Sequence, residues 1–401
     1  MSRKTILKSL LFLALILLPG IEKVQAQWST IHNLGTGPTD GCFSFSLHGK
    51  GYVGGGSNGS HFYEYDTTTG SWTLKGNSPG NHIRGFAYSF VANGKGYVGC
   101  GDTTGTNISC SDMWMYDDTT NTWTQKASFP DGSRDAMLCF VINDTAYIGG
   151  GFDPAGDAWN EFYKYNPYTD TWTALANLPM GAVGFPASFV INNKGYLATG
   201  FVGSAESSGL WQYDPGANTW TAKADFPGAA RQTAFGFALG NYGYVGGGMT
   251  NYTSVFNDMW RYNPLTDSWA SAPDYPSLYS AWSTAFTLGN TAYVGTGSYF
   301  GTTSLFGTDS FKRYRGTSTT DASEPKTAHI SIFPNPVGDY LNIACITGPD
   351  ARITLSDITG REVKSFTGIT TNVYVGDVPK GVYVLKCINT TGIYTEKIIK
   401  R

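Results

Sequence analysis

Charged side chains are scarce in this chain of 401 residues, because Asp, Glu, Lys and Arg together make up only 14% of it. This scarcity excludes a long coiled coil and a highly charged disordered chain. The net charge is −3, so the surface is mildly acidic. Nucleic acid is therefore not expected as a partner, because contacts with phosphates require clustered Lys and Arg.

Histidine is also scarce, and the cysteine patterns of metal sites do not occur. The five His residues share no spacing, and the six Cys residues form no C-x-x-C or Cys/His group of the kind that binds zinc. The Gly-rich segments end strands and open no helix, so they do not predict a nucleotide site. We therefore expect neither a metal nor a cofactor.

Only one long apolar run occurs, at residues 10–18, and its nine residues are too few to cross a bilayer. Basic residues precede it and the small-residue sequence VQA follows it, which is the order of a secretory signal peptide. Cleavage is expected between Ala26 and Gln27. The mature chain should then have no transmembrane helix, and the absence of a Cys after the cleavage site argues against a lipoprotein.

The cysteines have a second possible role, because export would permit disulfide bonds. Cys100 and Cys110 flank one loop, and Cys345 and Cys387 both lie in the last part of the chain. Each pair is a possible disulfide, and free buried thiols are equally compatible with the sequence.

Glycine and aromatic residues, in contrast, are abundant and recur in a fixed order. A segment of the GKGYVGGG type appears six times, and its Tyr residues are separated by 45, 50, 49, 48 and 49 positions. A segment of the FYEYD type follows each copy, and a Trp follows five of these second segments. An alternating apolar segment precedes each copy. The repeated Tyr residues are Tyr52, Tyr97, Tyr147, Tyr196, Tyr244 and Tyr293.

Four short strands within about 50 residues are typical of one blade of a β-propeller. The Gly pair, the Tyr and the Trp resemble the Kelch repeat of the galactose oxidase-like superfamily, in which Tyr and Trp pack between blades and Gly leaves room for them. The sixth unit lacks its Trp, whereas Trp28 precedes the first unit. We therefore expect an all-β fold with a six-bladed propeller over residues 27–315, closed by the N-terminal strand as the last strand of blade six.

After a polar linker at residues 316–328, a second alternating segment spans residues 329–401 and predicts a small β-sandwich. Its pieces FPNPVGDYLNI, LSDITGREV and PKGVYVLK and its basic end KIIKR resemble the C-terminal sorting domain of type IX secretion cargo in Gram-negative bacteria. The resemblance implies outer-membrane secretion machinery and a sortase-like protease as partners. It also implies a protein that is secreted or attached to the cell surface. The alternative is an ordinary β-sandwich accessory module.

The loops between the second and third strands of each unit differ from unit to unit, whereas the turns expected at the opposite side are short and alike. Binding sites concentrate in such variable loops. Aromatic residues there are candidates for contact with a glycan or a protein, or else they form the cores of their own loops. The candidates are Trp159, Phe201, Tyr252 and Tyr299.

Three arginines share one position in the repeat. Arg84, Arg134 and Arg231 each lie 13 residues before the repeated Tyr, where the strand order places the mouth of the central channel. Three guanidinium groups around one mouth could clamp a carboxylate or a sulfate, and rim arginines bind acidic ligands in propellers that these repeats resemble. In the competing interpretation, each Arg caps carbonyl groups of neighbouring loops.

Catalytic candidates are few, since residues 27–315 contain only three Glu. Glu206 lies in a variable loop and Glu161 lies where such a loop ends, so either could act as an acid or base beside an Arg, as in a Kelch sialic-acid mutarotase. The function favoured by the sequence is binding of a glycan or protein by the variable loops. The alternatives are a sugar-modifying enzyme of the mutarotase (epimerase) type and an adhesive or matrix component without a discrete pocket.

Overall fold

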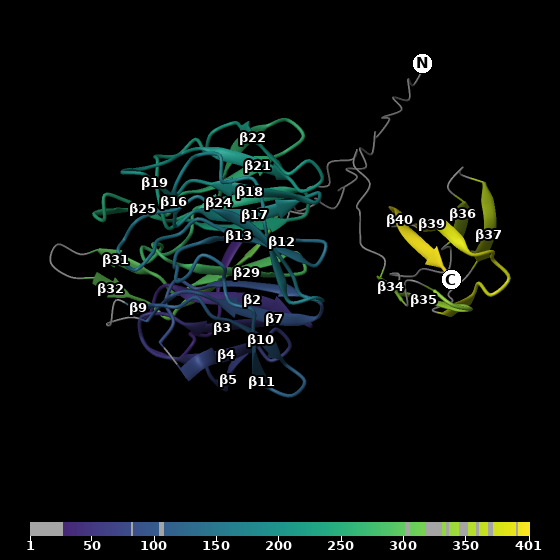
Figure 1. The fold of residues 1–401 in the computed structure, drawn as a ribbon, viewed down its shortest axis with the longest axis horizontal. Helices are drawn as coiled ribbons and strands as arrows, with labels where there is room; N and C mark the ends of the chain where they lie inside the picture. The colour runs from purple at the N-terminus through teal and green to yellow at the C-terminus, as the bar shows by residue number, and fades with distance from the viewer. Residues whose placement is uncertain are drawn as a thin grey trace, which may run out of the picture. The chain divides into compact units, whose positions relative to one another are not determined.

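The computed structural model describes residues 27–81, 83–103, 108–300, 305–316, 331–333, 337–344, 352–357, 361–367, 372–389 and 392–401. It divides into two compact units, Met1–Ser318 and Thr319–Arg401 (Figure 1). The predicted signal peptide lies outside the described residues. Within the described part, no helix is long and apolar enough to cross a membrane.

The first unit is built from four-stranded antiparallel sheets, and its described residues form six of them. We call these sheets blades one to six in chain order. Blades one to three are β2 (Cys42–Leu47), β3 (Lys50–Gly55), β4 (His61–Asp66), β5 (Ser71–Asn77); β6 (Tyr88–Ala92), β7 (Lys95–Gly99), β10 (Met113–Asp117), β11 (Thr122–Lys126); and β12 (Leu138–Ile142), β13 (Thr145–Gly149), β14 (Phe162–Asn166), β15 (Thr171–Ala174). Blades four to six are β17 (Ala187–Ile191), β18 (Lys194–Ala198), β21 (Leu210–Asp214), β22 (Thr219–Lys223); β23 (Phe235–Leu239), β24 (Tyr242–Gly246), β27 (Met259–Asn263), β28 (Ser268–Ala272); and β29 (Thr284–Leu288), β30 (Thr291–Gly295), β33 (Phe311–Arg315), β1 (Gln27–Thr30).

The first and last strands of this unit join in one sheet. Strand β1 pairs antiparallel with β33, and Trp28 lies opposite Tyr314, which agrees with the expected origin of the missing Trp. The innermost strands contact one another in circular order, β2 with β6, β6 with β12, β12 with β17, β17 with β23, β23 with β29 and β29 with β2. The six separate sheets therefore form a ring in which each innermost strand packs between those of its two neighbours.

The repeated Gly and Tyr serve the contacts between blades. The Tyr97 ring stacks on Phe90 of its own blade at 4.7 Å and approaches Tyr165 of the next blade at 5.9 Å. A Cβ atom on Gly96 would lie 2.5 Å from the Phe45 ring of the preceding blade. Any side chain at that position would therefore separate two blades that now pack at van der Waals distance.

Short additional strands extend the loops between the second and third strands of the blades. In the left part of Figure 1, strands β9, β19, β25, β31 and β32 lie along the same side of the propeller, and we call this side the variable face. The opposite turns are tight, and Asn143 and Asp144 both have the positive φ of a two-residue hairpin. The additional strands are β8 (Asp102–Thr103), β9 (Ile108–Ser109), β16 (Val183–Gly184), β19 (Phe201–Val202), β20 (Ala205–Glu206), β25 (Met249–Thr250), β26 (Ser254–Val255), β31 (Ser298–Phe300) and β32 (Leu305–Gly307). A 3-10 turn, η1 (Pro79–Asn81), precedes blade two.

The second unit has two sheets in its described residues, with strand orders β34-β35-β38 and β37-β36-β39-β40. Leu341 and Val373 from the first sheet share one buried core with Ile353 and Leu385 from the second, so the two sheets form a sandwich. The strands are β34 (Ser331–Phe333), β35 (Tyr340–Ala344), β36 (Arg352–Asp357), β37 (Glu362–Thr367), β38 (Asn372–Tyr374), β39 (Gly381–Asn389) and β40 (Gly392–Lys400).

Of the two alternatives for Cys100 and Cys110, the structure shows free thiols and not the possible disulfide. The Cys100 side chain is fully buried in the core between blades two and three, whereas Cys110 is half-buried at the end of the β8–β9 hairpin. Burial raises the pKa of both thiols. Cys345 lies outside the described residues, so its pairing with Cys387 stays a prediction.

Candidate functional site

The mouth of the central channel on the variable face is formed by one residue from each blade. These six residues follow the predicted arginine position by two, and all have a left-handed backbone with φ between 52° and 62°. Backbone hydrogen bonds join neighbours, for example from Phe86 N to Gly41 O (2.8 Å) and from Gly41 N to Trp282 O (3.1 Å). The residues of this mouth ring are Gly41, Phe86, Ala136, Phe185, Thr233 and Trp282.

Large and small residues alternate around the mouth ring. The even blades contribute the aromatics Phe86, Phe185 and Trp282, and the odd blades contribute Gly, Ala and Thr. Phe86 lies edge-to-face against Phe185 at 5.3 Å and is 6.0 Å from Trp282. A Cβ atom on Gly41 would lie 2.6 Å from the Phe86 ring. The axis therefore has room for three aromatic rings and not for six.

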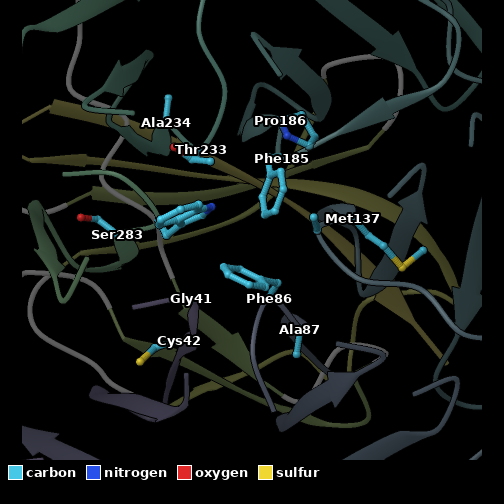
Figure 2. Close-up of a pocket in the computed structure, with 12 residues that line it drawn as sticks. Gly41, Cys42, Phe86, Ala87, Met137, Phe185, Pro186, Thr233, Ala234 and Ser283 are labelled. Atoms are coloured by element: carbon cyan, nitrogen blue, oxygen red, sulfur yellow. The ribbon is translucent and has the colours of Figure 1, made fainter. Parts of the chain in front are cut away.

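A pocket of about 170 Å³ lies at this mouth. Figure 2 shows Phe86 and Phe185 pointing into it from different blades, with Thr233 and Met137 at its sides. The channel continues below it as cavities of about 380 and 240 Å³ between the innermost strands. The hydroxyl groups there are already used, since Ser89 Oγ donates to Ser44 O (2.7 Å) and links two blades.

Further aromatic rings extend the mouth outward over blades three, four and five. Phe152 is 5.6 Å from Phe185 and 6.3 Å from Phe201, and Tyr252 is 6.5 Å from Trp282. All of these rings are partly exposed. We call the whole set the aromatic floor; it consists of Phe86, Phe152, Phe185, Phe201, Tyr252 and Trp282.

Arg84 and Arg231, two of the three predicted ligand-binding arginines, are not open to the mouth. Arg84 is fully buried, contacts both carboxylate oxygens of Asp112 at 2.8 and 2.9 Å, and donates to Cys100 O at 2.6 Å. Arg231 is equally buried and contacts both oxygens of Asp258 at 2.5 and 3.0 Å. The three-arginine clamp for an acidic ligand is therefore wrong, because these two charges are neutralised by carboxylates. The competing interpretation holds for both residues, since each also donates to a neighbouring carbonyl, Cys100 O or Gly247 O.

Arg134 differs from its two counterparts. Its guanidinium is buried, lies 4.6 Å above the exposed Trp159 ring, and donates to Ser133 O at 3.1 Å. The residue that corresponds to Asp112 in this blade is Glu161, and its buried Oε2 atom has no hydrogen-bond partner among the described residues. The structure therefore brings three candidate residues, Arg134, Trp159 and Glu161, into one part of blade three.

A small acidic pocket lies beside the aromatic floor. It measures about 160 Å³, and Asp102, Asp135, Asp153 and Phe152 line it. Burial, followed by the charge of Asp102, raises the pKa of Asp135 to about 7, although Ser109 Oγ donates to this carboxyl at 3.4 Å. Burial also raises the pKa of Asp102. Asp135 can therefore hold or release a proton near neutral pH.

Glu206, the other predicted acid or base, joins blades four and five. Its Oε1 atom accepts hydrogen bonds from Asn251 N (2.7 Å) and Gln232 Nε2 (3.4 Å). Burial acts to raise the pKa of Glu206, but the hydrogen bonds outweigh it and the pKa is lowered. An ionised, bonded carboxylate of this kind is a poor general acid. Tyr299, the last predicted contact residue, is 37% exposed and lies 6.2 Å from Tyr279.

Metal ligands are not grouped in the part of the chain that the structure describes, where no cluster of three or more His, Cys, Asp or Glu residues could hold an ion.

Sequence reasoning found Phe201 and Tyr252 but missed the three central rings and Asp135. A signal for them was present, because the repeat position two residues after the Arg reads Gly, Phe, Ala, Phe, Thr, Trp in the six units. The alternation becomes meaningful only when these positions are known to meet at one axis. Asp135 directly follows Arg134, and its burial could not be read from the sequence.

Comparisons with known proteins give two family matches. Residues 126–297 match the KLHDC2/KLHL20/DRC7 Kelch-repeats domain, and residues 331–401 match the secretion system C-terminal sorting domain. The solved structure of YjhT is similar to the chain with a TM-score of 0.60 and 18% identity, covering 68% of this chain and 94% of that one. This level of identity shows a common fold alone. No curated protein matches the chain significantly.

Proposed function

We propose that this chain, a Kelch-repeat β-propeller followed by a secretion system sorting domain, binds a glycan through the aromatic rings at the mouth of its variable face. The observation that carries the proposal is the cluster of Phe86, Phe185 and Trp282 above a pocket of about 170 Å³. Concave sites with aromatic walls and a few polar groups are typical of small-molecule and sugar binding.

The charges around the mouth favour a neutral glycan over an acidic one. The guanidinium groups of Arg84 and Arg231 are paired with carboxylates, whereas Asp135 and Asp153 line the pocket beside the floor. An anionic sugar would meet these carboxylates there, and the one nearby guanidinium without a paired carboxylate among the described residues, that of Arg134, is buried and offsets only the charge of Asp153 in part. This arrangement supports glycan binding more than an activity on sialic acid.

A glycan array probed with the exported protein tests the proposal. We expect Trp282→Ala to lose about tenfold in affinity, since one aromatic contact of this kind contributes on the order of 1 kcal/mol. Tyr168→Ala is the matched control, because Tyr168 is 66% exposed and lies in a turn of blade three, bonded to Asp144 at 3.1 Å. Phe86→Leu, which keeps most of the volume, guards against a folding defect.

Binding of no glycan, or equal binding by Trp282→Ala and the parent, would refute the proposal. Capture of a protein through the variable face would instead support the other ligand class. Retention in a matrix without any saturable binding would support an adhesive role.

A second candidate function is acid–base chemistry on the bound sugar. It is favoured by Asp135, whose carboxyl has a pKa of about 7 in a pocket that adjoins Phe152, because a group with this pKa exchanges protons efficiently at neutral pH. NMR spectra of each sugar that binds, recorded over time with the parent and with Asp135→Asn, would test it. Conversion by the parent alone supports an enzyme, and the absence of conversion excludes it.

The sorting domain indicates export by the type IX secretion system to the cell surface or the extracellular space, as found in Bacteroidetes. We further propose that the mature chain begins at Gln27 and that the secretion machinery removes residues 329–401. Intact-mass measurement of the protein from culture medium and from washed cells would check both ends. Retention of either segment in the exported form would contradict this part of the proposal.

A further inference from the structure

We infer that the site takes an internal stretch of an uncharged oligosaccharide chain, laid along the aromatic floor, rather than a single terminal sugar. This inference rests on the proposed glycan binding and adds the size and charge class of the ligand. It is carried by the continuity of the floor across five blades and by the carboxylates that flank its outer parts.

The floor is longer than one sugar ring. Its ring contacts run from Phe152 to Phe185 (5.6 Å), to Phe86 (5.3 Å), to Trp282 (6.0 Å) and to Tyr252 (6.5 Å). The path as a whole exceeds the length of one pyranose unit. The path therefore crosses the mouth from the loop of blade three to the hairpin of blade five.

The rings cannot all serve one sugar. Phe86 and Phe185 meet at an interplanar angle of 88°, so one flat sugar face can stack on only one of them. Phe152 and Tyr252 lie on opposite sides of this central pair along the contact path. We therefore assign three stacking positions, at Phe152, at the mouth and at Tyr252, which a chain of three units would fill.

The charged residues around the outer stacking positions determine which charge the bound oligosaccharide can carry. Phe152 lines the same pocket as Asp102, Asp135 and Asp153. Beyond Phe152, Phe201 is paired across β19 and β20 with the ionised Glu206. Carboxylates accept hydrogen bonds from sugar hydroxyl groups, whereas they repel uronic acids and sulfated sugars.

Two of the three nearby arginines do not offset these charges, and the third, Arg134, offsets only that of Asp153 in part. Arg84 and Arg231 each hold a carboxylate of their own blade at both oxygens. Arg134 is buried against the Trp159 ring. The aromatic floor itself contains no charged side chain. The ligand that fits it is therefore an uncharged oligosaccharide whose sugar units have two apolar faces.

Titration calorimetry on the exported protein tests the inference. The probes are cello-, laminari- and manno-oligosaccharides of one to six units, with oligogalacturonates as the acidic series. We expect affinity for one neutral series to rise at least tenfold from the monosaccharide to the trisaccharide and then to level off. At low salt, the oligogalacturonates should bind more weakly than the neutral oligosaccharides.

Two variants separate the subsites. Tyr252→Ala removes an outer ring that is 49% exposed, so it should weaken the trisaccharide about tenfold and leave the monosaccharide unchanged. Trp282→Ala should weaken both, and Tyr168→Ala should weaken neither. Phe152→Leu repeats the outer test on the blade-three side with less change in volume.

The outcomes are distinguishable. If a monosaccharide and a hexasaccharide bind equally through Trp282, the extended floor is refuted while glycan binding at the mouth stands. Tighter binding of oligogalacturonates refutes the charge assignment. If no member of any series binds, both the inference and the proposed function fail.

Discussion

Replacing Asp135 by Asn should stabilise the protein at alkaline pH and have little effect in acid. In the folded chain, burial and the charge of Asp102 raise the pKa of Asp135 from 3.8 to about 7. An Asn side chain keeps the shape and can still accept the hydrogen bond from Ser109 Oγ. It carries no charge, so the energetic cost of a buried carboxylate disappears.

The sign follows from the two protonation states. Below pH 3.8 the carboxyl is protonated in both the folded and the unfolded chain, so it costs nothing. As pH rises from 3.8 to 7, the unfolded chain ionises first and the free energy of unfolding falls. Above pH 7 the fall in the free energy of unfolding is complete. At about 1.4 kcal/mol per pKa unit, the loss is at most about 4 kcal/mol, and solvent relaxation around the pocket reduces it to roughly 2 kcal/mol.

Urea unfolding of the parent and of Asp135→Asn near pH 5 and near pH 8 measures this effect. We expect the variant to gain about 2 kcal/mol at the higher pH and clearly less at the lower one. Asp153→Asn is the control of opposite sign, because backbone and Trp159 hydrogen bonds outweigh burial and lower the pKa of Asp153. A gain that is equal at both pH values, or a loss near pH 8, would refute the argument.

Three further substitutions follow from packing and pairing, and urea unfolding of each variant checks them. Arg84→Met should lose about 3 to 5 kcal/mol because it removes the cation that both oxygens of Asp112 contact, whereas Arg134→Met should lose about 1 kcal/mol; equal losses would contradict the different pairing. Gly96→Ala should lose about 1 to 3 kcal/mol, since its Cβ would lie 2.5 Å from the Phe45 ring of blade one, and an unchanged stability would show that the blades can separate freely. Thr199→Gly should gain about 1 kcal/mol because Thr has φ 59° and an unpaired buried hydroxyl there, so a loss would mean that the strain is negligible.

The sequence predicts the architecture well because the fold repeats. A Tyr spaced at nearly constant intervals has the same neighbours in every unit, and Trp28 could be assigned to the last sheet because a unit without its Trp needs another strand. The pairing of β1 with β33 agrees with that reasoning. The Gly positions follow the same logic, since Gly96 faces a Phe ring of the preceding blade.

The site is harder to predict from the sequence, because it depends on residues that differ from one repeat to the next. Arg84 and Arg231 looked like a ligand clamp because position alone placed them at the mouth. Their partners Asp112 and Asp258 lie 28 and 27 residues later, beyond the reach of local patterns. The sequence leaves the pairing of Cys100 and Cys110 open for a similar reason, since nearness along a loop does not tell whether two thiols face the same environment.

Because large and small residues alternate around the mouth, the sixfold arrangement of blades has only approximate threefold symmetry there. The two kinds of position have different roles, one structural and one in ligand contact. The odd blades place Asp40, Asp135 and Gln232 directly before their small mouth residues, and these polar groups bond to Ser298, Ser109 and Glu206 of the preceding even blades. Closing the ring of sheets requires only six equivalent units and does not require the alternation. Because only three rings fit at the axis, the even blades carry the aromatic contacts while the odd blades hold the even loops in place. Changes at the odd positions should therefore act on loop geometry, whereas changes at Phe86, Phe185 or Trp282 should act on the ligand directly.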